Sequence, residues 1–244
     1  MATVAVYSLK GGVGKTTLAV NLAWCSATLS ARRTLLWDLD PQAAATFLLG
    51  GGTGKAQAQS VFSKDVEPAK LVHASATARL DLIGADASLR GLDLLFHELD
   101  KKKRLAKLLG QLDKAYDRMV LDCPPGLTET SEQVMRAADL IVVPVIPSPL
   151  SERALAEIEA HLGNKATGRL MPVHSMADRR RKLHAETIAR NPGWPVIPMA
   201  SVVETMAARR APVGAFAGRT AGARAFAELW QAIERRLAKA KRKA

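Results

Sequence analysis

The stretch TVAVYSLKGGVGKTT, residues 3–17, joins an apolar run to a glycine-rich turn and decides how the chain begins to fold. Residues 3–9 predict a buried strand, and residues 15–30 predict a helix that starts directly after the glycines. A strand, a glycine-rich turn and a helix N-terminus gather several backbone N–H groups around one point, and the helix dipole adds to the positive field there. The stretch therefore predicts a phosphate-binding loop at the carboxyl end of the first strand.

Each residue type in this loop has a chemical reason to be there. Glycines let the backbone come close to phosphate oxygens, Lys15 can reach the β- and γ-phosphates, and the Thr16 hydroxyl can bind Mg²⁺. The loop departs from the usual G-x-x-x-x-G-K-[ST] pattern, because Leu9 replaces the first glycine and a second lysine, Lys10, follows it. The expected nucleotide-binding residues are Gly11, Gly12, Val13, Gly14, Lys15, Thr16 and Thr17.

Strand-like and helix-like segments alternate along the rest of the chain. Apolar strands separated by helices indicate an α/β protein of the P-loop NTPase type, with a mainly parallel, doubly wound sheet and helices on both faces. We expect one domain spanning residues 1–244. Residues 50–60 predict a plain loop, because their TGKA sequence offers Ala56 instead of a hydroxyl to a metal. Further strands are predicted at 33–40, 80–85, 117–125, 139–147, 168–176 and 193–200, and further helices at 92–112 and 221–242.

Acidic side chains end two of the predicted strands. Asp122 in VLDCPP lies at the carboxyl end of its strand, which is the ligand-binding edge of an open α/β sheet. Asp38 and Asp40 end another strand in WDLDPQ, and residues two apart on a strand point the same way. Mg²⁺ prefers oxygen ligands, so Asp122 would hold the metal through a water, and either of the other two could orient the attacking water. A solvated strand end is the alternative interpretation of the Asp38–Asp40 pair.

The motifs KGGVGKTT, DLDPQ and DCPP, in this order, resemble those of the ParA/MinD family of deviant Walker-type ATPases. The resemblance is specific in the first half of the chain and looser in the second, where it rests on strand order and PVIPS. It implies ATP and Mg²⁺ as cofactors, slow hydrolysis that a partner stimulates, and a homodimer in which Lys10 reaches the nucleotide of the other subunit. It also implies catalytic roles for Lys10, Lys15 and Asp40, and metal-side roles for Thr16, Asp38 and Asp122.

The basic charge is concentrated in the second part of the chain. The net charge is +12, and residues 1–150 hold 17 Lys/Arg against 15 Asp/Glu, whereas residues 151–244 hold 18 against 8. Such asymmetry favours a polyanionic partner, and Lys and Arg without interleaved aromatic residues favour non-sequence-specific duplex DNA. Solvated helix faces are the alternative. The candidate DNA-binding residues are Arg179, Arg180, Arg181, Lys182, Arg209, Arg210, Arg219 and Arg224.

Two positions depart from the resemblance. Many ParA-like chains have an arginine after the late IP strand, where this chain has Met199, so the DNA surface is expected to move toward the clusters at 179–182 and 209–210. The family often reads adenine with an asparagine, near which this chain has Ser175. Adenine over guanine therefore rests on the resemblance alone.

The chain ends in a predicted amphipathic helix. Phe226, Leu229, Trp230, Ile233 and Leu237 fall on one face at helical spacing. This stripe suits docking against the chain's own sheet, which we expect, and it also suits a membrane surface, as in a MinD-like protein.

Together these features predict a cytoplasmic, nucleoid-associated ATPase that segregates or positions a plasmid, chromosome or protein cargo with a ParB-like or cargo-adaptor activator. No apolar stretch is long enough to span a bilayer, no signal peptide is seen, and the two cysteines suit a reduced compartment. No helix-turn-helix segment precedes the loop, so we expect a short ParA-like protein. The alternatives are a MinD-like membrane-associated regulator of division or polar placement and an iron–sulfur reductase, which would need Cys25 and Cys123 at a dimer axis.

Overall fold

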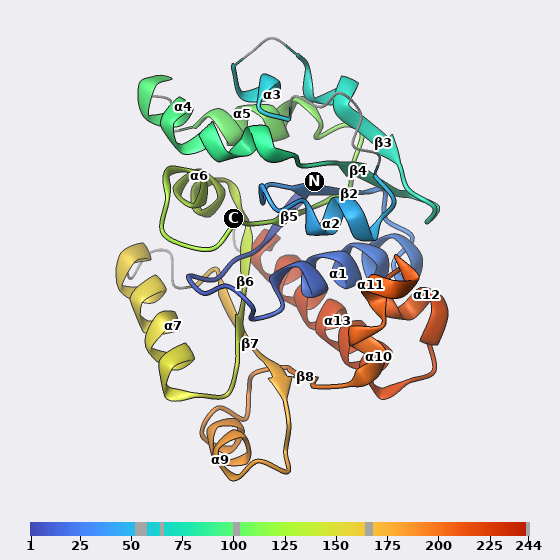
Figure 1. The fold of residues 1–244 in the computed structure, drawn as a ribbon, viewed down its shortest axis with the longest axis vertical. Coiled ribbons are helices and arrows are strands. Elements are labelled where there is room, and N and C mark those ends of the chain that lie inside the picture. Colours follow the sequence, from blue (N-terminus) through green and yellow to red (C-terminus); the bar gives the residue numbers. More distant parts are fainter. Residues whose placement is uncertain (52–57, 64–65, 100–102, 164–167, 243–244) are drawn as a thin grey trace.

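The computed structural model describes residues 1–51, 58–63, 66–99, 103–163 and 168–242 (Figure 1). Their strands form one eight-stranded sheet in the order β3-β4-β2-β5-β1-β6-β7-β8. All neighbouring pairs are parallel except β3 with β4. The strands are β1 (Ala2–Val6), β2 (Thr34–Asp38), β3 (Val72–Ala74), β4 (Leu80–Ile83), β5 (Arg118–Asp122), β6 (Leu140–Val145), β7 (Leu170–Ala177) and β8 (Val196–Pro198).

Helices cover both faces of this sheet, which confirms the predicted doubly wound α/β fold (Figure 1). Short 3₁₀ turns at Pro68–Leu71 and Ala87–Gly91 flank β3 and β4. The described helices are α1 (Lys15–Leu29), α2 (Ala44–Leu48), α3 (Ser60–Ser63), α4 (Leu92–Leu99), α5 (Arg104–Gln111), α6 (Glu129–Ala137), α7 (Pro149–Leu162), α9 (Lys182–Arg190), α10 (Ser201–Glu204), α11 (Met206–Arg209), α12 (Val213–Ala217) and α13 (Ala221–Lys241).

The sheet separates two hydrophobic cores, because successive strand residues point to opposite faces. On β1, Val4 and Val6 belong to the core beneath α1 and α13, whereas Ala5 belongs to the core beneath α4, α5, α6 and α7. The central strands are buried throughout, which explains their near-continuous apolar sequences. Strand order reverses beside β1, which has β5 on one side and β6 on the other. The loop after β1 therefore lies at a topological switch point, where open α/β sheets bind ligands.

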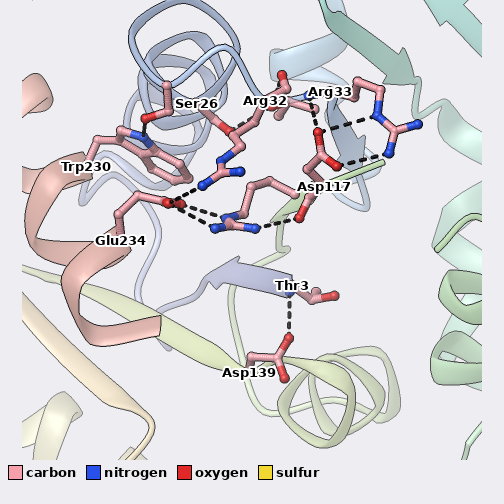
Figure 2. Close-up of polar contacts among 11 residues, drawn as sticks. Thr3, Ser26, Arg32, Arg33, Asp117, Asp139, Trp230 and Glu234 are labelled. Atoms are coloured by element: carbon pink, nitrogen blue, oxygen red, sulfur yellow. Dashed lines mark hydrogen bonds and ion pairs between the residues drawn. The ribbon is translucent and has the colours of Figure 1, made fainter. Parts of the chain in front are cut away.

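Helix α13 docks on its own domain, as its apolar stripe predicts. Phe226, Leu229, Trp230, Ile233 and Leu237 are all buried, and α13 contacts both α1 and β8. Polar contacts fix the helix at the amino ends of the strands, shown in Figure 2. Figure 2 labels Trp230 and Glu234 of α13. The indole of Trp230 donates to the Ser30 hydroxyl at 2.8 Å, and Arg118 pairs with Glu234 at 2.6 Å. Within the described residues, no helix combines the length and apolarity that crossing a membrane requires.

Three details differ from, or go beyond, the sequence-based expectations. The helix expected over 92–112 is two helices, α4 and α5, because Lys103 leaves the helical conformation with φ −130° and the Arg104 side chain turns to the carbonyls of Val61 and Phe62. Strand β3 was missed because none of its three side chains is buried. Most of the predicted loop at 50–60, including its TGKA sequence, lies outside the described residues.

Candidate nucleotide-binding site

The glycine-rich loop after β1 has the backbone geometry that its sequence predicts. Gly12 has φ +70° and Gly14 has φ +88°, conformations that residues with a Cβ rarely adopt. A Cβ on Gly14 would also lie 3.1 Å from the Ser175 hydroxyl, so space as well as conformation requires glycine there. Gly14 caps α1 without a side-chain hydrogen bond to the helix N-terminus. The backbone N–H groups of the first turn are therefore available to an anion at the positive end of the helix dipole.

The two lysines of the loop are placed differently. Lys15 is buried, and its ammonium group donates to the carbonyl of Lys10 at 3.1 Å. Burial lowers the pKa of Lys15, while the neighbouring carboxylates of Asp122 and Asp40 act in the opposite direction. Lys10 is half-buried, and its side chain makes no hydrogen bond or ion pair with any described residue. The loop thus uses one lysine inside its own site and leaves the second free to act elsewhere.

Asp38 and Asp122 lie opposite each other on adjacent strands, as their strand-end positions predict. The register of β2 with β5 pairs Asp38 with Asp122, and the register of β1 with β5 pairs Val6 with Asp122. The Asp122 carboxylate is therefore beside both Asp38 and the base of the phosphate loop. Burial, and then the charge of Asp38, raise the pKa of Asp122, and burial also raises the pKa of Asp38.

Hydrogen bonding separates the two aspartates. Asp38 accepts bonds from the Asp40 amide at 3.1 Å and from the Thr46 amide and hydroxyl at 2.9 and 2.7 Å. Asp122 is fully buried, and neither of its oxygens has a hydrogen-bond partner among the described residues. The Thr16 hydroxyl is near enough to lower the pKa of Asp122, although it does not reach hydrogen-bonding geometry. A buried carboxylate without a partner is costly, and a cation between it and Thr16 would remove that cost.

Asp40 lies in a turn that leads directly into α2. Its carboxylate accepts from the Gln42 amide at 2.9 Å and its carbonyl from the Ala43 amide at 2.8 Å. The turn and α2 therefore form one hydrogen-bonded unit, which Thr46 ties to Asp38. Sequence reasoning missed Thr46, because nothing in AAATF marks a residue that binds a strand-end carboxylate eight positions earlier.

An apolar hollow opens beside the phosphate loop, between the ends of β7 and β8. The Ser175 side chain is buried and donates to the carbonyl of Val13 at 2.8 Å, so its hydroxyl is engaged in holding the loop. Ser175 does not offer this hollow the amide edge of an asparagine. The walls of the hollow come from Gly14, Thr17, Leu18, Ser175, Met176, Ile197, Pro198, Met199, Ala200, Val203, Glu204 and Phe226.

Comparisons with known proteins identify the family to which the chain belongs. The model of a family described as "AAA domain" matches residues 1–166, more than half of the chain. The chain belongs to the ParA/MinD family of ATPases. The chromosome partitioning protein ParA of Caulobacter vibrioides (strain NA1000 / CB15N) is 30% identical over 205 residues, which cover 78% of this chain and 75% of that protein.

Two further members of the ParA/MinD family show how far the likeness extends. The sporulation initiation inhibitor protein Soj of Bacillus subtilis (strain 168) is 35% identical over 147 residues, covering 58% of this chain. The matched stretch spans only 57% of the length of that relative. The septum site-determining protein MinD of Pyrococcus horikoshii OT3, complexed with Mg-ADP, superposes with a TM-score of 0.81 at 19% identity, covering 95% of each chain. The last comparison shows that the fold is shared.

The structure divides the candidate DNA-binding residues into two groups. Arg179, Arg180 and Arg181 lie in the turn after β7, and Lys182 begins α9. Here the Arg180 guanidinium donates to both oxygens of Asp178 at 2.9 and 3.0 Å, Arg181 lies 3.8 Å from the same carboxylate, and Lys182 pairs with Glu186 at 3.9 Å. The second group consists of Arg209, Arg210, Arg219 and Arg224, from α11 to the first turn of α13.

This second group lies in a stretch without any acidic residue, residues 205–227, which we name the acid-free segment. All four of its arginines are exposed, and none of them makes an ion pair with a described residue. Figure 1 shows α10, α11 and α12 gathered at one side of the molecule next to α1, away from α9, and α12 contacts both α1 and α13. The two groups therefore come from different elements, although Arg179 and Arg180 line one hollow with Ser201 and Val202 of α10.

Proposed function

We propose that this chain is an ATP-dependent partition or positioning ATPase, acting as a single domain over residues 1–244. It would bind ATP and Mg²⁺ at the phosphate loop, form a homodimer, and adhere to duplex DNA without sequence preference. The observation that carries this proposal is the Asp122 carboxylate, which is fully buried, has no hydrogen-bond partner among the residues that the structure describes, and stands beside Thr16 and Lys15. Such a group fits a divalent cation held next to a bound triphosphate.

The residues around the site divide the chemistry among them. Backbone N–H groups of residues 11–17 and the Lys15 ammonium would bind the β- and γ-phosphates. Thr16 and Asp122 would hold Mg²⁺, which neutralises phosphate charge when bound, while Asp38 fixes the Asp40 turn from the metal side. Asp40 would orient the attacking water. ATP over GTP rests on the family, because Ser175 is engaged with the loop.

Lys10 supplies the reason for a dimer. Its ammonium group has no partner among the described residues, and a triphosphate carries more charge than one loop neutralises. A lysine delivered from a second subunit would couple dimerisation to the γ-phosphate, in the manner of an arginine finger supplied in trans. The ATP-bound dimer would then hold nucleoid DNA in the cytoplasm, and a ParB-like or cargo-bound activator would stimulate hydrolysis and release it.

The shared use of Lys10 can be tested by mixing two inactive variants. Lys10→Ala keeps its own Asp40, and Asp40→Ala keeps its own Lys10, so a mixed dimer contains one complete site. We expect each variant alone to hydrolyse ATP far more slowly than the wild type, and an equal mixture to restore about a quarter of the sites if subunits pair at random. A mixture no more active than its components would show that Lys10 does not act across an interface.

DNA binding is tested by co-sedimentation with ATP, ADP or no nucleotide. We expect the wild type to bind duplex DNA much more tightly with ATP than with ADP or no nucleotide, and Lys15→Ala to lose both nucleotide binding and the tight binding of DNA. A Lys15→Ala protein that still dimerises and coats DNA with ATP would contradict the proposal. Liposomes serve as the comparison surface, since the apolar stripe of α13 is buried in its own core and is not available to a membrane in this structure.

The burial of both thiols argues against the iron–sulfur alternative. Cys123 is fully buried, Cys25 is 2% exposed, and burial raises the pKa of the Cys25 thiol to about 12. Cluster ligation requires thiolates that meet at a dimer axis. Cys25 lies inside α1, within the core under α13, where it cannot meet its counterpart from another subunit.

A further inference from the structure

One arginine of the acid-free segment is in direct contact with α2, the helix that follows the Asp38–Asp40 turn. The guanidinium carbon of Arg210 lies 4.6 Å from the ring centroid of Phe47, and the Nε–H of Arg210 donates to the Phe47 carbonyl at 3.2 Å. Phe47 belongs to α2 and is half exposed, so it is not a core residue. The contact uses the face of the guanidinium and one of its five N–H donors. The other four donors make no hydrogen bond with a described residue, so they remain available to water or to an anion.

Helix α2 connects this contact to the residues around the γ-phosphate position. The Phe47 amide donates to the Ala43 carbonyl at 2.9 Å, and the Ala43 amide donates to the Asp40 carbonyl at 2.8 Å. The neighbour of Phe47, Thr46, binds the Asp38 carboxylate with both its amide and its hydroxyl. A displacement of the Asp38–Asp40 turn therefore moves the platform on which Arg210 lies.

A second set of contacts holds the backbone on both sides of Arg210 against the phosphate-loop helix. The side-chain amide of Asn21, which is buried, donates to the carbonyl of Thr17 at 2.8 Å and to the sulfur of Met206 at 3.2 Å. Its oxygen accepts from the Val213 amide at 2.9 Å. One residue of α1 thus fixes the segment four residues before Arg210 and three residues after it.

Arg210 itself has an unusual backbone conformation. Its φ of +47° lies in the left-handed region, which non-glycine residues seldom occupy unless their surroundings require it. The next helix is equally constrained, because a Cβ on Gly214 would lie 2.1 Å from the Trp24 ring of α1. The position of Arg210 is therefore specified by α1 and α2 together, the two elements that also build the nucleotide site.

We propose that Phe47 is the positioning residue through which the nucleotide site sets Arg210 for contact with a DNA phosphate. The inference rests on the DNA-binding function proposed above and says how the nucleotide site regulates that binding. Phe47 orients the Arg210 guanidinium but carries no charge that would neutralise it. Because α2 joins Phe47 to the Asp38–Asp40 turn, a change in the conformation of this turn changes the affinity for DNA. Coupling of this kind is reciprocal, so DNA tightens the binding of an ATP analogue by the same factor as the analogue tightens the binding of DNA.

The test measures a ratio, namely the affinity for a fluorescent DNA duplex with a non-hydrolysable ATP analogue divided by the affinity with ADP. Phe47→Leu is expected to lower this ratio by about two- to fivefold, the range of an exposed cation–π contact, and Phe47→Tyr to preserve it. Arg210→Lys keeps the charge but loses the planar face and the Nε–H, so it should lower the ratio while retaining the salt dependence of binding. All variants are compared at a concentration where light scattering gives them the same oligomeric state.

Arg219→Ala is the matched control, because it removes an exposed arginine of the same segment whose side chain makes no hydrogen bond, ion pair or ring contact with the described residues of α2. It should weaken DNA binding equally with both nucleotides and leave the ratio unchanged. A wild-type ratio in Phe47→Leu, or equal effects of Phe47→Leu and Arg219→Ala, would overturn the role of Phe47 while leaving the proposed function intact. A wild-type protein that binds no DNA with either nucleotide would overturn both.

Discussion

Residues 179–182 and the acid-free segment each hold four basic side chains, but only the first of these stretches has acidic partners. In residues 179–182, Asp178 takes two guanidinium groups and Glu186 takes the lysine, which leaves Arg179 as the one cation of the four without an ion pair among the described residues. In the acid-free segment, none of the four arginines has a described acidic partner. The two stretches therefore carry the same number of basic side chains. More of these side chains are available to a DNA phosphate in the acid-free segment, because none of them is paired with a described acid.

The comparison also concerns position. The turn after β7 that carries residues 179–182 leads into α9, which Figure 1 shows at the end of the molecule beyond β8. The acid-free segment is packed onto α1 and α13, and Arg210 touches α2. We therefore expect the acid-free segment to supply most of the DNA contacts and, through Arg210, part of the nucleotide dependence. Residues 179–182 should supply a weaker attraction that does not depend on the nucleotide.

The largest effect is expected from removing the charge of the acid-free segment. Changing Arg209, Arg210, Arg219 and Arg224 together to Gln removes up to four phosphate contacts. Each contact contributes about 0.9 to the slope of log affinity against log salt, so the slope should fall in magnitude by about three to four. Affinity should fall by more than about tenfold at moderate salt. The measurement is a salt titration of duplex binding in the presence of the ATP analogue.

The control for this variant is ATP binding without DNA, which should stay unchanged because these arginines lie outside the nucleotide site. An unchanged salt slope would mean that the acid-free segment does not touch DNA.

Two single substitutions that each remove one positive charge should differ by a smaller amount in the salt slope of DNA binding. Arg209→Gln removes an arginine without an ionic partner and should lower the salt slope by about one. Arg180→Gln removes a guanidinium that already donates to both oxygens of Asp178, and should change the slope less. Both side chains are exposed, so neither change should affect folding. Equal salt slopes for the two variants would contradict the expectation that the ion pair with Asp178 reduces the contribution of Arg180 to DNA binding.

Part of this distinction could be predicted from the sequence and part could not. Asp178 stands directly before the run of arginines in MADRRRKLH, so its neutralising effect was visible, yet all four cations were predicted as DNA contacts. The absence of acids from 205–227 was visible as well. The Phe47–Arg210 contact was not, because it joins residues 163 positions apart and neither belongs to a recognisable motif.

In the nucleotide site, too, some features could be predicted from the sequence and others could not. The glycine geometry at Gly12 and Gly14 and the pairing of Asp38 with Asp122 follow from local motifs and from strand ends that meet at one edge. The contacts of Asn21 and Ser175 join positions 192 and 162 residues apart. Such contacts depend on the assembled fold, and a single sequence contains no signal for them.

The opposite change, removal of the acid in the first stretch, should strengthen DNA binding. Asp178→Asn frees Arg180 and Arg181, and because exposed ion pairs are weak, we expect a gain of only about two- to fivefold in affinity. Lowering the pH to 5 does not reproduce the effect of the Asp178→Asn substitution. The Arg180 guanidinium lowers the pKa of Asp178 to about 2, so the carboxylate stays charged at pH 5 and the wild-type protein gains nothing from this residue. Anisotropy titrations at pH 5 and pH 7 measure both effects.

The smallest effect on DNA binding is expected from a substitution at the other end of the helix that carries Arg224. Glu234→Gln removes the charge that pairs with Arg118, whose side chain is only 10% exposed. The guanidinium then keeps its hydrogen bond to the Asp117 carbonyl at 2.7 Å but loses its ionic partner. We expect a loss of about 1–3 kcal/mol in the free energy of unfolding. For a chain of this size, Tm falls by about 2–4 °C for each kcal/mol.

DNA affinity of the Glu234→Gln protein, measured well below its Tm, should match that of the wild type, because the pair lies at the amino ends of the strands, far along α13 from Arg224. This variant therefore tests whether a loss of stability alone changes the affinity for DNA. If DNA affinity fell together with Tm, loss of α13 docking would explain reduced binding without any loss of phosphate contacts. The effect of the quadruple arginine variant would then have to be measured again at equal stability, and only a difference in salt slope that persisted there would belong to the acid-free segment.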